Sequence, residues 1–240
     1  MHVTTAPILL IGGTRGTGLL ISRALVERGT PIRVFARDPD RATSELGPTP
    51  EILPGDLTRE ATLDPAVAGV RHIIFTAGCR SGRPVGPSRI RRTEYEGVVH
   101  TLRAASRAGF SGRFLYMNSS GIGARSFWTL ALNIYKGNTL VWRQRAEAAI
   151  RASGLQYTII RTGMLTNRTG GVRAIEVTQR ALPLSPRYRI ARADVAAAFV
   201  AAIDHPRVVR STFEIVWASG PRRKTWDELL DCVAPDDPPY

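Results

Sequence analysis

The sequence predicts an α/β fold in which helices cover both faces of one doubly wound, mostly parallel β-sheet. Two observations predict it. Short runs rich in β-branched residues alternate with longer segments of helical period, and a glycine cluster directly follows the first of these runs. Alternation of this kind is typical of a parallel sheet, because each crossover between parallel strands needs a connection about as long as a helix.

The expected elements follow in chain order. Strands are expected over residues 8–11, 32–36, 51–53, 72–76, 113–117, 157–161 and 212–216. Helices are expected over residues 16–28, 59–67, 93–108, 138–152, 192–204 and 225–233. Gly29, Gly109 and Gly154 each follow a helical run and precede a strand, where glycine adopts the left-handed C-cap conformation without steric cost.

Chain length and loop lengths bound the organisation. We expect one domain over residues 1–240, because α/β domains of this size often form a single unit. Two connections are long, residues 79–92 and 163–190. In a doubly wound sheet the ligand lies outside the carboxyl ends of the strands, so both segments are expected to face a substrate.

Composition argues against several classes of protein. The two cysteines, Cys79 and Cys232, are too few for a disulfide framework, and no metal site is expected. No apolar run approaches the roughly 20 residues that span a bilayer, so we expect a cytoplasmic protein without a membrane partner. The net charge of +13 raises nucleic acid as a partner. The arginines are spread along the chain, however, and no nucleic-acid partner is expected.

The glycine cluster carries the first functional prediction. Glycines at positions 12, 16 and 18 let the backbone turn sharply and approach a pyrophosphate, which the free amides of the following helix attract. The predicted cofactor contacts in this loop are Gly12, Thr14, Arg15, Gly16, Thr17 and Gly18. The fold is then of the Rossmann type. The competing interpretation is a plain strand-to-helix turn.

Charge after the second expected strand predicts the choice of cofactor. Arg37 stands where an acidic residue would bind the ribose of NAD(H), and a guanidinium there suits the 2′-phosphate of NADP(H). Arg15 lies on the same side and could complete a bidentate clamp. NADP(H) is therefore preferred, with NAD(H) as the alternative. In the other interpretation Arg37 faces solvent and Asp38 caps a helix.

Taken together, these motifs resemble the atypical, NmrA-like branch of the short-chain dehydrogenase/reductase superfamily. The residues that carry the resemblance are Gly12, Gly16 and Gly18, Asp56-Leu57, Thr76-Ala77-Gly78, Tyr95-Glu96-Gly97, Ser119-Ser120, residues 153–161 and residues 193–196. The resemblance implies that Asp56 and Leu57 contact adenine and that Ala77 and Gly78 line the cofactor. It also implies that Thr162, Gly163 and Met164 border the nicotinamide.

The catalytic pair of this superfamily is absent from its expected place. Its members donate a proton from the tyrosine of a Tyr-x-x-x-Lys pair. By resemblance the family's Lys-Ala-Glu aligns with Arg145-Ala146-Glu147, which puts Val141 at the tyrosine position. Arg145 could hold the ribose, but a guanidinium stays protonated and is no general acid.

Other groups are candidates for the chemistry. If the helix is continuous from Tyr135, Tyr135 and Arg145 share one face and Tyr135 could donate the proton; core packing is the alternative. Ser119 or Ser120 is expected to orient a substrate carbonyl, unless both only complete a turn. A water or a substrate hydroxyl would then supply the proton.

The substrate class is predicted only broadly. Arginines between the fourth strand and the next helix favour an acidic substrate or form a solvated loop: Arg80, Arg83, Arg89, Arg91 and Arg92. Phe127, Trp128, Trp142 and Met164 form either an apolar wall for an aromatic substrate or ordinary core.

The predicted function is an NADPH-dependent reductase of a ketone, quinone or similar conjugated acceptor, with tailoring of an aromatic polyketide as one setting. The alternative is a regulator or chaperone that senses the cofactor without turning it over, and isomerases or epimerases are a third class. We expect a monomer or a homodimer whose partner is a small molecule.

Overall fold

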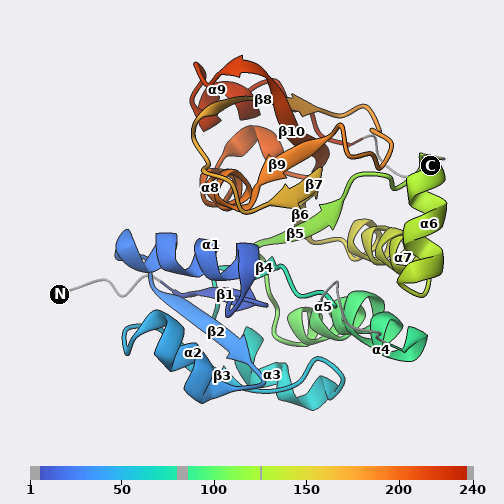
Figure 1. The fold of residues 1–240 in the computed structure, drawn as a ribbon. Coiled ribbons are helices and arrows are strands. Elements are labelled where there is room, and N and C mark those ends of the chain that lie inside the picture. The colour runs from blue at the N-terminus through green and yellow to red at the C-terminus, as the bar shows by residue number, and fades with distance from the viewer. Residues whose placement is uncertain (1–5, 80–85, 125, 237–240) are drawn as a thin grey trace.

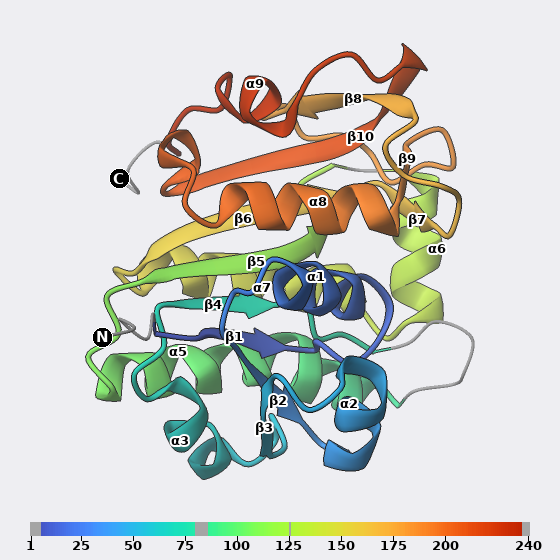
Figure 2. The ribbon, with the colours of Figure 1, turned by 90° about the vertical axis from the view of Figure 1, so that its left-hand side faces the viewer.

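One central sheet organises the chain. The computed structural model describes residues 6–79, 86–124 and 126–236. The sheet contains eight strands: β1 (Ile8–Ile11), β2 (Ile32–Ala36), β3 (Glu51–Pro54), β4 (His72–Phe75), β5 (Arg113–Ser119), β6 (Gln156–Thr162), β8 (Arg173–Thr178) and β10 (Ser211–Pro221). Their order is β3-β2-β1-β4-β5-β6-β10-β8, and only the edge strand β8 runs antiparallel to its neighbour (Figures 1 and 2). The predicted fold class is confirmed.

The order of the strands positions the ligand site. The chain winds from β1 outward through β2 to β3 and then returns to β4 on the other side of β1. Strand order therefore reverses between β1 and β4, and ligands of such sheets bind outside the carboxyl ends at this point. In Figure 2 the arrowheads of β1, β4 and β5 point toward the side on which helix α6 (Phe127–Tyr135) stands.

Helices bury both faces of the sheet. The remaining α-helices are α1 (Gly16–Glu27), α2 (Pro39–Leu46), α3 (Asp64–Val67), α4 (Pro87–Arg91), α5 (Gly97–Arg107), α7 (Thr139–Ala152), α8 (Arg192–Ala202) and α9 (Trp226–Leu230). Alternate residues of β1 enter opposite cores: Ile8 and Leu10 pack with α1 and α8, whereas Leu9 and Ile11 pack with α3, α5 and α7. A strand buried on both faces reads as a continuous apolar run, as this one does.

Several expected boundaries were wrong. The expected helix 93–108 begins earlier, since α4 and a five-residue π-helical turn, η2 (Arg92–Glu96), precede α5. The expected helix 59–67 is divided into η1 (Glu60–Thr62) and α3. Helix α2 was not among the expected helices, but the alternative interpretation, in which Arg37 faces solvent and Asp38 caps a helix, agrees with the structure. The N-cap of α2 is Asp38, whose carboxylate accepts a hydrogen bond from the Arg41 amide at 3.1 Å.

The long connection 163–190 is not a plain loop. It contains β7 (Met164–Thr166) and β8, and its end enters β9 (Arg189–Ala191), which pairs in parallel with β7. Within the described residues, no helix is both long enough and apolar enough to cross a membrane.

Candidate active site

The glycine loop lies against the end of β4. Gly12 has φ +92°, and a Cβ built there would lie 2.6 Å from the backbone nitrogen of Ala77. A Cβ at Gly18 would lie 2.2 Å from the carbonyl oxygen of Gly12. Neither position has room for a side chain, so both glycines are needed for close packing of the loop, strand and helix.

The first turn of α1 is open to a ligand. Its N-cap, Arg15, makes no side-chain capping bond, and no acidic residue stands in the first turn. The hydroxyl of Thr17 is buried without a hydrogen-bond partner among the described residues. Unpaired helix amides and an unpaired buried hydroxyl suit the oxygens of a phosphate group.

The ends of β2 and β3 form a second part of the site. A depression of about 310 Å³ is lined by Arg37, Pro54, Gly55, Asp56, Arg59 and Thr62. Burial alone would raise the pKa of Asp56, but hydrogen bonds from Thr58 and the charges of Arg37 and Arg59 lower it overall. Sequence reasoning predicted Arg37 and Asp56 here and missed Arg59. Leu57 packs against Gly97 of α5.

The two serines at the end of β5 differ sharply. Ser119 is half-buried, and its hydroxyl donates to the carbonyl oxygen of Ser120 at 3.1 Å. Ser120 is fully buried, and its amide donates to the carbonyl oxygen of Thr162 at 2.9 Å. Of the two predicted candidates, Ser119 is therefore the one that is not fully buried.

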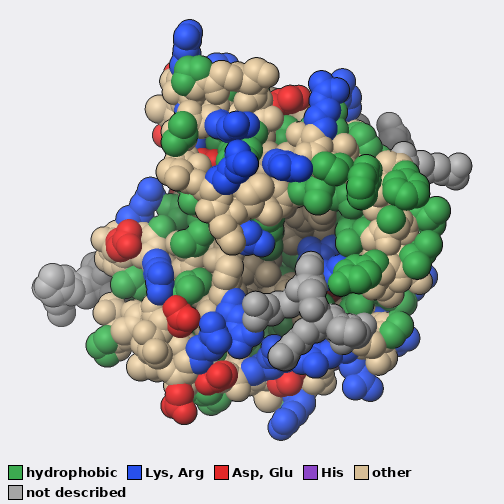
Figure 3. Space-filling model, in the orientation of Figure 1, with side chains coloured by type: hydrophobic (Ala, Val, Ile, Leu, Met, Phe, Trp, Pro, Cys, Tyr) green, Lys and Arg blue, Asp and Glu red, His purple; other side chains and the backbone are tan. Residues whose placement is uncertain are grey.

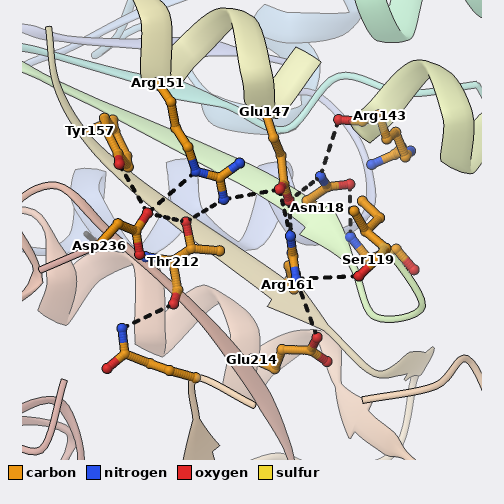
Figure 4. A network of polar contacts seen from close by, with 12 residues as sticks. Asn118, Ser119, Arg143, Glu147, Arg151, Tyr157, Arg161, Thr212, Glu214 and Asp236 are labelled. Atoms are coloured by element: carbon orange, nitrogen blue, oxygen red, sulfur yellow. Dashed lines mark hydrogen bonds and ion pairs between the residues drawn. The ribbon is translucent and has the colours of Figure 1, made fainter. Parts of the chain in front are cut away.

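A buried polar network holds the backbone of Ser119 (Figure 4). Asn118 accepts a hydrogen bond from the Ser119 amide at 2.9 Å and donates to Glu147 at 2.7 Å. The carboxylate of Glu147 also accepts from Arg161 at 2.6 Å and from Arg151 at 3.1 Å. Both guanidinium groups compensate its buried charge, which makes the network rigid.

A second buried ion pair lies next to the Gly78 turn. Arg143 of α7 bonds to Glu94 of the π-helical turn, and its Nη1 donates to the carbonyl oxygen of Met117 at 3.4 Å. A Cβ at Gly78 would lie 2.7 Å from Nη2 of Arg143. The buried hydroxyl of Thr139, one helical turn before Arg143, donates a hydrogen bond to Glu94.

Glu94 accepts hydrogen bonds from Arg143, from the Thr139 hydroxyl and from the Cys79 amide. Burial would raise its pKa, but Arg143, the Thr139 hydroxyl and the Cys79 amide at 3.0 Å together hold it below its ordinary value. π-Helical turns occur frequently at functional sites, and this one aims a carboxylate inward at the ends of β4 and β5.

Lys136 extends the same cluster toward solvent. Its ammonium donates to the carbonyl oxygen of Cys79 at 3.0 Å. Burial lowers the pKa of Lys136, and Glu94 and Arg143 act on it in opposite directions. Sequence reasoning missed Lys136, although lysine stands out in a chain whose other basic residues, apart from Lys224, are arginines.

The predicted helix face of Tyr135 and Arg145 was wrong. Helix α6 ends at Tyr135, and left-handed residues at Gly137 and Asn138 separate it from α7. The side chain of Tyr135 is 69% exposed. Arg145 is exposed too and stacks on Trp142 at 4.7 Å, whereas Arg143, about 200° away around α7, faces the Gly78 turn.

At the end of β6, two of the three predicted cofactor contacts pack inside the protein. The hydroxyl of Thr162 is buried and donates to the carbonyl oxygen of Asn118 at 3.2 Å, so it does not face a ligand as expected. Gly163 packs against the carbonyl of Tyr188, where a Cβ would lie 2.8 Å away. Met164 is 40% exposed, so its side chain can contact a ligand.

Helix α6 presents apolar side chains at the surface. Phe127, Trp128, Leu130 and Ile134 are all exposed. Figure 3 shows hydrophobic side chains over α6 along one side of a hollow, with basic groups near its other side. Trp142, by contrast, is enclosed between Tyr95 and Arg145.

Only part of the expected arginine cluster is placed. Arg80 and Arg83 lie outside the described residues. Arg89, Arg91 and Arg92 are exposed, and Arg91 pairs with Glu96 at 2.7 Å.

Residues 12–206 match the family model described as NAD(P)H-binding. The chain belongs to this family. It is similar to sanguinarine reductase of Eschscholzia californica, with 29% identity over 87% of this chain and 88% of the relative. The expected membership of the atypical reductases is confirmed, and these matches support an NAD(P)H-dependent oxidoreductase.

Solved structures with the same fold cover nearly the whole chain. A protein from Bacillus halodurans described as a putative NAD-dependent epimerase/dehydratase superimposes with a TM-score of 0.74 and 21% identity, over 94% of this chain and 99% of the other. An anaerobillin reductase from Escherichia coli O157:H7 has a TM-score of 0.70 and 21% identity, over 90% and 98%. At this identity the likeness shows the fold.

The residues of this NAD(P)H-binding protein fit its cofactor. The loop 12–18 would hold the pyrophosphate, because its glycines leave no room for side chains and the Thr17 hydroxyl lacks a partner within the described chain. The depression at Arg37, Asp56 and Arg59 would hold the adenosine end. Gly78, Ser119 and Met164 would then lie at the nicotinamide end.

Proposed function

We propose that the chain is an NADPH-dependent reductase of a ketone, quinone or related conjugated acceptor. The observation that carries this proposal is the convergence of three groups at the carboxyl ends of β4 and β5. Ser119 ends β5, the Arg143 guanidinium lies beside Gly78 and the Met117 carbonyl, and the Lys136 ammonium bonds to the Cys79 carbonyl just beyond β4. The glycine loop touches the end of β4. A hydrogen-bond donor and a fixed cation stabilise the oxyanion that forms when hydride is added to a carbonyl, and a proton donor completes the alcohol.

The preference for NADPH is supported by charge around the adenosine end. Arg37 and Arg59 flank one depression, and Arg15 is exposed in the neighbouring loop. Guanidinium groups bind a phosphate bidentately, and Arg59 adds a donor to the pair that the sequence suggested. Among the described residues, Asp56 is the one carboxylate that lines this depression, and its single negative charge does not neutralise both Arg37 and Arg59.

When bound, the cofactor would supply the hydride that adds to the carbonyl carbon of the acceptor. In our proposal the Ser119 hydroxyl leaves the Ser120 carbonyl and donates to the substrate oxygen. The Lys136 ammonium gives its proton to that oxygen as charge develops, and solvent then reprotonates the amine. Arginine cannot do this at ordinary pH, which distinguishes Lys136 from every arginine nearby. Arg143, in place of Arg145, would hold the ribose.

Exposed apolar surface supports an aromatic acceptor. Phe127 and Ile134 of α6 are 74% and 76% exposed. Hydrophobic side chains over α6 border the hollow of Figure 3. Apolar side chains gathered at the mouth of a site mark a binding surface more often than chance exposure. The proposed partner is therefore a small aromatic molecule, of the kind processed in polyketide metabolism, bound by a cytoplasmic monomer or homodimer.

A panel assay tests the proposal. The absorbance of reduced nicotinamide is followed while ketones, quinones and polycyclic aromatics are added to the protein and NADPH. Oxidation of NADPH by a panel member, lost in Ser119→Ala and retained in the buried control Ser120→Ala, is the expected result. Tight binding of NADPH without oxidation across the panel would contradict a reductase of this class.

One observation favours the alternative of a cofactor-sensing regulator. Four residues before Arg143, the position of a catalytic tyrosine would fall on Thr139, which is buried and bonded to Glu94. Helix α7 therefore presents no phenol to the site. A regulator would bind NADPH and NADP+ with different affinities and show no turnover, so parallel titrations with both forms separate the two functions.

A further inference from the structure

We propose that Arg192, far outside the glycine motif, binds the pyrophosphate of the dinucleotide from the side opposite the loop. This inference rests on dinucleotide binding, which the proposed function requires, and is independent of turnover. It adds a cofactor contact from the second half of the chain, and it makes Asn167 a positioning residue for that contact.

The first observation is the closeness of Arg192 to the loop. Arg192 begins α8, which packs against α1 through Ile21, Val195 and Phe199 in one apolar core. A Cβ built at Gly16 would lie 3.8 Å from Nε of Arg192. Gly16 has φ +53° and is the residue at which α1 begins. The guanidinium therefore stands over the open first turn where a phosphate would bind.

The second observation is how Arg192 is held. Its Nη1 donates to the side-chain oxygen of Asn167 at 2.6 Å. Asn167 directly follows β7, and the pairing of Thr166 with Ala191 in the β7–β9 ladder sets Asn167 beside Arg192. The ladder thus orients the guanidinium through a neutral amide, which leaves its charge uncompensated.

The third observation is electrostatic. A cation in the first turn of a helix is opposed by the helix dipole, and Arg192 lies near the positive ends of both α1 and α8. Within the described residues no carboxylate pairs with Arg192. The nearby Asp194 is already engaged by the Gly171 amide at 2.6 Å and the Trp217 indole at 2.8 Å. A bound dianionic pyrophosphate would remove this repulsion.

Calorimetric titration with a set of ligands tests the assignment. Arg192→Ala is expected to weaken NADPH, NADH and ADP-ribose by the same factor, about ten- to a hundred-fold, since all three carry the pyrophosphate. Adenosine, which carries neither phosphate of the pyrophosphate, should bind as to the wild type. Arg168→Ala, which removes an exposed arginine one residue beyond Asn167, is the matched control and should change nothing.

Two further variants keep the inference decidable. Arg192→Lys should recover part of the affinity, and Asn167→Ala should weaken all three pyrophosphate-containing ligands by a smaller common factor. Arg192→Ala should also keep the melting temperature of the free protein while reducing the rise in melting temperature that NADPH produces. If Arg192 had only a structural role, Arg192→Ala would lower the melting temperature of the free protein instead.

Specific results would overturn the inference. Unchanged affinity of Arg192→Ala for NADH would do so, as would a loss confined to NADPH, which would assign Arg192 to the 2′-phosphate. An equal loss for adenosine would likewise contradict a pyrophosphate contact. Because every readout is binding or melting, a wild-type protein that binds NADPH without turning it over contradicts the reductase proposal alone.

Discussion

Arg143 and Glu94 form an ion pair with Nε of Arg143 3.1 Å from Oε2 of Glu94, and the carboxylate side chain has no exposed surface. The two residues come from α7 and from the π-helical turn η2, so the pair joins two helices over the ends of β4 and β5. Removal of one partner from such a pair leaves an uncompensated buried charge.

Glu94→Gln should therefore lower the free energy of unfolding by about 3–5 kcal/mol. Denaturant titration measures it. The exposed pair Arg91–Glu96 offers the control, because Glu96→Gln should cost less than about 1 kcal/mol. Equal effects of the two variants would show that burial of Glu94 does not matter.

The same pair predicts a dependence on pH. The pKa of Glu94 is lowered from its ordinary 4.5, so its stabilisation is complete above that value and is lost as the pH falls through the lowered folded-state pKa. The difference in unfolding free energy between wild type and Glu94→Gln should shrink over that acidic range. A constant difference would contradict the assignment.

Ser119→Ala should lower kcat about 10²- to 10³-fold, because it removes a donor to the developing oxyanion. The Kd for NADPH should stay within about two-fold, since the hydroxyl contacts the acceptor. Steady-state kinetics and titration measure the two effects. Ser120→Ala, which alters a fully buried neighbour, should retain turnover.

Lys136→Arg keeps a positive charge but removes an acid that can release its proton. It should lower kcat about 10²- to 10⁴-fold with little change in NADPH affinity. Lys136→Met should do the same, and full turnover by either variant would remove Lys136 from the chemistry. In the wild type, kcat should fall as the pH rises through a pKa below the ordinary 10.5, since burial lowers it. The charged or titratable groups around Lys136 are Glu94, Arg143 and Cys79.

Arg37→Ala and Arg59→Ala should each weaken NADPH about ten-fold or more and leave NADH within about two-fold. Fluorescence titration of the two reduced cofactors measures the ratio. Arg23→Ala, on the exposed side of α1 and paired with Glu45, serves as the control. Equal losses for both cofactors would show that neither arginine reads the 2′-phosphate.

The central strands were predictable because their burial leaves a direct trace in the sequence. β1 and β2 begin and end at the expected residues, since both faces of β1 are covered and every residue of that strand is apolar. β8 was missed because only Ile175 of this edge strand is buried, so the strand shows no clear alternation of apolar and polar residues. An edge strand has fewer apolar demands than a central one.

The site divides in the same way. The glycine loop is local in sequence, so its geometry follows from neighbouring residues. Arg143 was missed because its role depends on contacts with Glu94 and Gly78, which are distant in sequence and lie next to α7 only in the folded chain. Tyr135 was misplaced because two successive left-handed residues, Gly137 and Asn138, turn the chain between the helices.

The scarcity of lysine makes one position of the site chemically addressable. Lys136 and Lys224 are the lysine side chains of this sequence, and Lys224 is exposed on the far strand-to-helix connection before α9. An amine-selective acylating reagent therefore modifies two side-chain positions that one tryptic or chymotryptic mass map distinguishes. With its lowered pKa, Lys136 offers more free amine at neutral pH than an ordinary lysine. The extent of acylation of Lys136, normalised to that of Lys224, therefore reports whether a ligand occupies the mouth of the site. This measurement needs no known substrate.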